Sequence, residues 1–182
     1  MNKELVAIVL SGLLAACGST AGRNSANPDP CPNVVVLEDA ARLIEFDGEQ
    51  VIEDVAYTAE IVDINSACRY FDDQPINAEI AVDFAFGKGP KATEDQKVFK
   101  YFVAVTRTDR EVIAKQEFVI PVNFSGKKTV VVKSEDIDRI TIPRANESTS
   151  GLNFEIVVGI SLTPAQVIYN RSGKSLKFPD LK

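Results

Sequence analysis

FKYFVAVTRTDREVIAKQEFVIPV, residues 99–122, has the pattern of a β-hairpin. Over residues 99–105 every second side chain is apolar, which is the period of a strand that buries one face. Residues 108–110 are polar and include an aspartate, as a short turn requires, and residues 112–122 run back from them. This hairpin predicts a mainly β fold.

Six further segments share the β pattern, at the spacing of a sandwich rather than of alternating strands and helices. We expect a single helical turn in residues 38–43. The pattern therefore predicts an antiparallel immunoglobulin-like β-sandwich of about eight strands. The six further strands are expected at residues 33–37, 55–64, 78–86, 129–132, 137–142 and 152–160.

One helix start is clearly signalled, near the end of the chain. Thr163 is a suitable N-cap, Pro164 follows at the first helical position, and Gln166 completes a capping box. Arg171 suits the negative end of the helix dipole, and Gly173 is placed to end the helix. We therefore expect one short C-terminal helix.

Two of the predicted strands are also apolar on the face turned away from the core. Ala81 and Ala85 lie on one strand, and Phe102 and Ala104 on another. Such a face needs a cover. The simpler cover is the C-terminal helix, and the alternative is a partner that buries Phe102. The helix would contribute Ala165, Val167 and Ile168.

The composition fits one globular domain. The 182 residues are 45% hydrophobic and 25% charged, which is ordinary for a protein with a buried core. The net charge of −6 argues against nucleic acid as a partner, because phosphate binding requires clustered Lys and Arg.

The N-terminus has the features of a secretory leader. Lys3 supplies a positive charge, residues 5–14 form an apolar run too short to span a bilayer, and small residues precede Cys17. Residues 18–30 are mainly small and polar and include proline, so they are expected to form a flexible tether.

The order Leu14-Ala15-Ala16-Cys17 resembles the lipobox of bacterial lipoproteins. The resemblance covers only the leader, and the globular part resembles no family that we recognise. It implies a signal peptide at residues 1–16, a lipidated Cys17 in a tether at residues 17–30, and a single domain at residues 31–182. Because Gly18 is not the aspartate associated with inner-membrane retention in enteric lipoproteins, the resemblance implies an outer-membrane anchor that faces the periplasm.

The remaining cysteines form a pair. If Cys17 carries lipid, Cys31 and Cys68 are left in an oxidising compartment, where a disulfide is expected between them. The alternative is two reduced, buried cysteines that act as small hydrophobic residues.

The residues of the chain exclude several kinds of chemistry. Histidine is absent, so histidine-based catalysis and His-rich zinc sites are impossible. The acidic segment 47–54 lacks the ligand spacing of a calcium loop. We expect no cofactor and no metal. An enzyme would depend on carboxylates such as Asp63, Asp72 or Asp83 converging in the fold.

These observations favour a non-enzymatic protein-binding or assembly module, held at the membrane by its lipid, with an envelope protein as its partner. A small-molecule-binding periplasmic receptor is the first alternative, and a carboxylate-based enzyme is the second. The candidate interface residues are Arg69, Tyr70 and Phe102, and Arg144 has similar character. Each of these could instead serve the structure of the domain.

Overall fold

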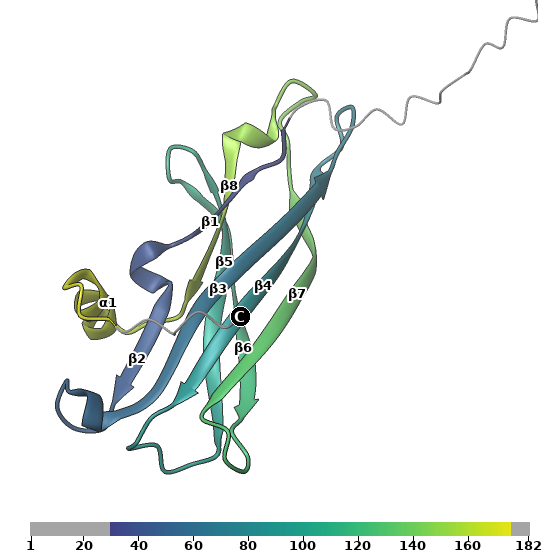
Figure 1. Ribbon diagram of the computed structural model, residues 1–182. Coiled ribbons are helices and arrows are strands. Elements are labelled where there is room, and N and C mark those ends of the chain that lie inside the picture. The colour runs from purple at the N-terminus through teal and green to yellow at the C-terminus, as the bar shows by residue number, and fades with distance from the viewer. Residues whose placement is uncertain (1–29, 176–182) are drawn as a thin grey trace, which may run out of the picture.

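The computed structural model describes residues 30–175, whose eight strands form two four-stranded sheets that pack face to face (Figure 1). We name each sheet after its most central long strand. The β5 sheet has the order β1 (Asn33–Val36), β8 (Phe154–Ile160), β5 (Gln96–Arg107), β6 (Val112–Asn123). The β4 sheet has the order β2 (Arg42–Phe46), β3 (Val55–Arg69), β4 (Ile76–Lys88), β7 (Val130–Ile142).

The predicted fold class is confirmed: the domain is a mainly β sandwich with one helix near its C-terminal end. Neighbouring strands are antiparallel with one exception. The short β1 pairs in parallel with β8, where Val34 lies beside Ile156. That pair joins residues that are far apart in sequence, and it closes the edge of the β5 sheet.

The core lies between the sheets and is built from alternate residues of the long strands. Aromatic rings from the two sheets meet there: the centroids of Phe84 and Tyr101 lie 5.0 Å apart, and those of Phe86 and Phe99 lie 4.6 Å apart. Such contacts add to the free energy gained by burying the rings. Burial and the nearby Glu135 carboxylate raise the pKa of Tyr101 to about 12, so its hydroxyl remains protonated at neutral pH.

Two strand predictions need correction, although the predicted total of eight agrees with the structure. Residues 38–43 were expected to form a helical turn, but only Glu38–Ala40 form a 3₁₀ helix (η1), and Arg42–Phe46 form β2. Residues 129–132 and 137–142 were expected to be separate strands, but they belong to the single strand β7. A missed strand and a divided strand therefore offset each other.

Two further 3₁₀ helices precede strands, η2 (Ile52–Asp54) before β3 and η3 (Gly151–Asn153) before β8. Among residues 30–175, no helix combines the length and the apolar character that a bilayer crossing requires.

The helix α1 (Pro164–Arg171) begins with the predicted capping box. The Thr163 hydroxyl accepts a hydrogen bond from the Gln166 N–H at 3.4 Å, and the Gln166 side-chain oxygen accepts one from the Thr163 N–H at 2.8 Å. Gly173 follows the helix with a φ of 74°, a conformation that favours glycine.

The expected docking of this helix over Phe102 and the outward alanines is wrong. α1 packs instead against η1 and β2: the Tyr169 and Phe46 rings lie 5.3 Å apart, and the Asn170 amide donates to the Arg42 carbonyl at 2.7 Å. Phe102 needs no such cover, because its ring lies against the backbone of Gly159 in the adjacent strand.

Candidate binding groove

The predicted disulfide is present: Cys31 is bonded to Cys68, with their Cα atoms 5.8 Å apart. It joins the segment before β1 to the last residues of β3, at the end of the molecule where the chain enters the domain (Figure 1). Cys17, the predicted lipidation site, lies outside the described residues.

Tyr70 helps the disulfide to hold the segment before β1 against the domain. Its hydroxyl donates to the Pro30 carbonyl at 2.9 Å and accepts from the Gly151 N–H at 3.3 Å. Only glycine fits at position 151, because a Cβ atom there would lie 2.4 Å from the Pro30 carbonyl oxygen. Tyr70 is 1% exposed, so its ring serves this attachment and is not free to contact a partner.

Arg144 fastens the turn after β3 to the segment after β7. Its guanidinium donates to the carbonyls of Thr149 at 2.7 Å, Asp72 at 2.6 Å and Gln74 at 3.0 Å, and also to that of Glu147. The same group lies over the Tyr70 ring, 4.8 Å from its centroid. Arg144 therefore has a structural role, whereas from the sequence it could equally have belonged to an interface.

Because lysine cannot reproduce this fork of donors, Arg144→Lys is expected to lower the free energy of unfolding by about 2 kcal/mol. Urea unfolding would measure the loss. Arg139→Lys is the matched control, because the Arg139 side chain is exposed and should tolerate the change. Equal stability of the two variants would contradict this role of Arg144.

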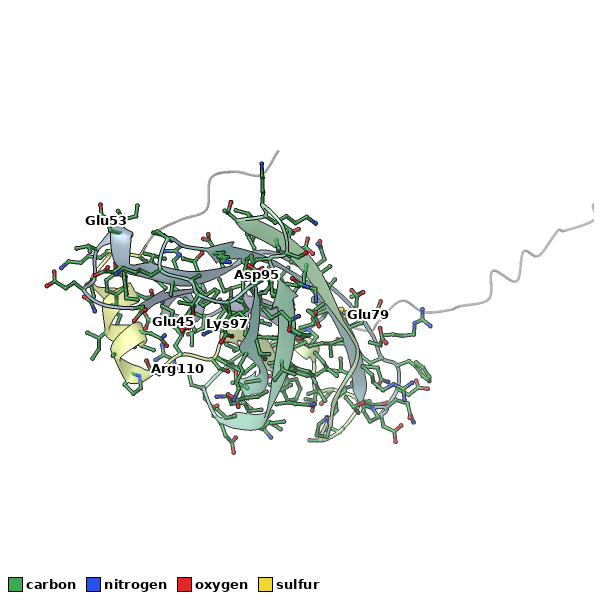
Figure 2. The ribbon with its side chains drawn as sticks, turned by 90° about the horizontal axis from the view of Figure 1, so that it is seen from below. Glu45, Glu53, Glu79, Asp95, Lys97 and Arg110 are labelled. Atoms are coloured by element: carbon green, nitrogen blue, oxygen red, sulfur yellow. A yellow bond between two sulfur atoms is a disulfide. The ribbon has the colours of Figure 1, made fainter. Side chains whose placement is uncertain are left out.

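A surface groove of about 540 Å³ lies beside the disulfide, on the outer face of the β4 sheet. A second groove of about 320 Å³ shares three of its lining residues, Ala67, Glu79 and Asp138. The strand period explains the lining: Glu79 alternates with the buried Ala78 and Ile80 and therefore points outward. In Figure 2, Glu79 lies toward the opposite end of the molecule from Glu53.

Charges of both signs line the two grooves. Arg69 and Arg139 are the positive side chains, and Glu79, Asp136 and Asp138 are the negative ones. All five are exposed, and within residues 30–175 none of them forms an ion pair shorter than 4.0 Å. These charges are therefore free to pair with a ligand.

The structure separates the predicted interface residues. Arg69 lines the groove, Tyr70 is buried beside it, and Phe102 lies in the other sheet with the Lys115 ammonium 4.3 Å from its ring centroid. Phe71 adds an aromatic side chain to the groove that is 50% exposed.

Of the charged residues of the groove, only Arg69 was predicted from the sequence. The others come from the two strands β4 and β7, and what they share is an exposed, polar position on a strand. Sequence alone could not show that these positions lie side by side, because the register of β3, β4 and β7 decides it.

Of the three carboxylates on which an enzyme would depend, two lie together and Asp72 lies apart from them. Asp63 lies directly opposite Asp83, whose carboxylate accepts a hydrogen bond from the Ser134 hydroxyl at 2.6 Å. Asp72 is in the turn after β3, and neither Asp63 nor Asp83 lines either groove. Among the described residues, no three His, Cys, Asp or Glu side chains are grouped to hold a metal ion.

The acidic segment before β3 is an ordered loop. The Asp54 carboxylate accepts from the Glu49 N–H at 2.8 Å and lies 3.3 Å from the Lys91 ammonium. The hydrogen bond from the Glu49 N–H is the main cause that lowers the pKa of the Asp54 carboxyl group, and the Lys91 ammonium lowers it further. These contacts stabilise the conformation of the loop and give no indication of a ligand.

Comparison with known proteins identifies no family. No protein-family model matches the chain, and no curated protein matches it significantly. Among solved structures, the variable (V) domain of the AgI/II polypeptide BspA of Streptococcus agalactiae matches with 11% identity and a TM-score of 0.21. The match covers 66% of this chain and 72% of that one. At this TM-score it carries no argument about function.

Proposed function

We propose that this chain is a lipid-anchored, non-enzymatic module of the bacterial cell envelope that holds a segment of a partner protein in the groove. The anchor in this proposal is Cys17, the last residue of the Leu14-Ala15-Ala16-Cys17 order. The Cys31–Cys68 disulfide supports an oxidising compartment, because structural disulfides are rare in a reducing cytosol.

The free charges of the groove carry the binding part of the proposal. Arg69, Arg139, Glu79 and Asp138 project from three hydrogen-bonded strands, so the backbone that carries them is ordered before a ligand arrives. Binding to an ordered backbone avoids the entropic cost of ordering a loop. Since both signs are present, the matching ligand is a peptide segment that carries both acidic and basic side chains.

The groove lies at the tethered end of the domain, because Cys68, which lines it, is bonded to Cys31. The tether that the sequence predicts at residues 18–30 lies, apart from Pro30, outside the described residues, and a flexible chain of that length has a root-mean-square reach of about 20 Å. The groove would therefore stay close to the anchoring membrane. Its partner is then expected to be a membrane-associated protein or one that approaches the same surface.

Crosslinking in cells followed by purification of the full chain tests this function. Arg139→Glu reverses one groove charge, whereas Arg110→Glu reverses an exposed arginine in the turn between β5 and β6. The first variant is expected to lower recovery of the partner about tenfold, because a misplaced charge in an interface costs more than 1 kcal/mol. The second should leave recovery unchanged. Equal recovery with both variants would remove the groove from the binding site.

A further inference from the structure

Strand β6 is the most open edge of the sandwich. The other edge strands are blunted: β1 has four residues, β2 has α1 packed against it, and β7 has an irregular register opposite Ala78 and Ile80. β7 also turns Lys133 and Glu135 toward the inner side of the sheet, opposite Phe84 and Val82. β6, in contrast, pairs without interruption with β5 from Ala114 to Asn123.

The hydrogen bonds identify the backbone groups that face this open edge. The Phe124 N–H donates to the Asp95 carbonyl at 2.7 Å, so even-numbered residues of β6 bond to β5. The Ser161 N–H donates to the Lys100 carbonyl at 2.9 Å, which shows that even-numbered residues of β5 bond to β8 instead and agrees with this parity. From residue 115 to residue 119, the odd-numbered backbone groups of β6 therefore point away from the sheet, whereas Pro121 has no N–H and its carbonyl accepts a hydrogen bond from the Lys133 ammonium at 3.0 Å.

The charges along this edge are arranged so that the β6 edges of two copies are complementary. Lys115 and Glu117 flank Gln116, so an antiparallel pairing of two β6 strands centred on Gln116 places each lysine opposite the glutamate of the other copy. In that register the odd-numbered residues form the hydrogen-bonded pairs, as their direction requires. Shifting the centre to residue 115 or 117 places identical charges opposite each other.

We propose that β6 is a self-association surface, through which two copies of this chain join their β5 sheets into one continuous sheet. Both charges are held in place beforehand: the Lys115 ammonium lies over the Phe102 ring, and the Glu117 carboxylate accepts from the Ser161 hydroxyl at 2.8 Å. Ile113 and Val119, which are 36% and 60% exposed, face their counterparts at the ends of the paired segment.

Covalent trapping suits this association, because pairing of such a short segment buries less than the ~1,200 Å² of a typical stable interface. The pairing places the two Gln116 residues directly opposite in a non-hydrogen-bonded pair, with Cα atoms about 4.5 Å apart, within reach of a disulfide. Two Ala114 residues would lie about 14 Å apart along the strands. Gln116→Cys and Ala114→Cys therefore differ in their expected crosslinking although they are neighbours on one strand.

The test is mild oxidation of cells that make each full-length cysteine variant, followed by non-reducing electrophoresis. Gln116→Cys is expected to give at least about fivefold more covalent dimer than Ala114→Cys. Adding Lys115→Glu should reduce that dimer about fivefold, because it places like charges opposite each other, and adding Glu117→Lys as well should restore it.

Equal crosslinking at positions 116 and 114, or none at 116, would overturn the proposal. Failure of the charge exchange to restore the dimer would also overturn it. The result is independent of the groove, because the groove lies on the β4 sheet and none of these substitutions touches it.

Discussion

Replacing Cys31 and Cys68 together with serine is expected to lower the free energy of unfolding by about 4 kcal/mol. The disulfide joins residues 37 positions apart, and on the chain-entropy model its loss restores that much conformational freedom to the unfolded chain. The loss is a large part of the roughly 5–15 kcal/mol that stabilises a typical domain. The hydrogen bonds of Tyr70 to Pro30 and Gly151 cannot replace it, because a hydrogen bond contributes only about 1 kcal/mol.

Urea unfolding of the purified protein measures this effect. Wild-type protein unfolded with a reductant is the control, and it should lose the same stability as the double variant. If both lose less than about 1 kcal/mol, the disulfide does not have the stabilising role that we assign to it.

Cys17→Ser is expected to move the protein from the membrane fraction to the soluble fraction and to abolish its labelling by fatty acids. Each buried methylene of an acyl chain contributes ~0.8 kcal/mol to membrane binding, so several chains hold a protein firmly. Ser19→Ala, two positions along the chain, is the control and should stay with the membrane. Full retention of the Cys17→Ser variant would show that the proposed anchor is not at this residue.

The elements that the sequence located correctly have local signals. The β5–β6 hairpin follows from the alternation on both arms and from its polar turn. The start of α1 follows from Thr163 and Gln166, whose side chains each accept a backbone N–H of the other, and from Pro164, which has no N–H to satisfy. The Cys31–Cys68 pair follows from counting cysteines, because Cys17 was set aside for lipid.

The misjudged strands lack such local signals. In β2, Leu43 and Ile44 are adjacent and both buried, so the alternation of a half-buried strand is missing. In β7, Ser134, Glu135 and Asp136 interrupt the apolar pattern, which an edge strand tolerates because its inner face is only partly covered. The parallel pairing of β1 with β8 depends on tertiary structure and leaves no trace in either segment.

The sequence predicted candidate interface residues but not the groove. Arg69 was singled out for its residue type, but the strand register brings it beside Asn77 and leaves Phe102 on the other sheet. The role of Arg144 could not be predicted from its residue type either. An arginine can serve either an interface or a fold, and only its carbonyl partners distinguish the two.

Photocrosslinking from position 67 tests the central claim, that the groove holds a protein partner at the membrane. Ala67 lines both grooves and is exposed, so a photoreactive residue there removes no groove charge. Lys100, exposed on the other sheet, provides the control position. Our account predicts one crosslinked protein from position 67 of the full chain in cells, its loss in the Arg139→Glu variant, and its absence from position 100. No crosslink from position 67, or the same product from both positions, would contradict it.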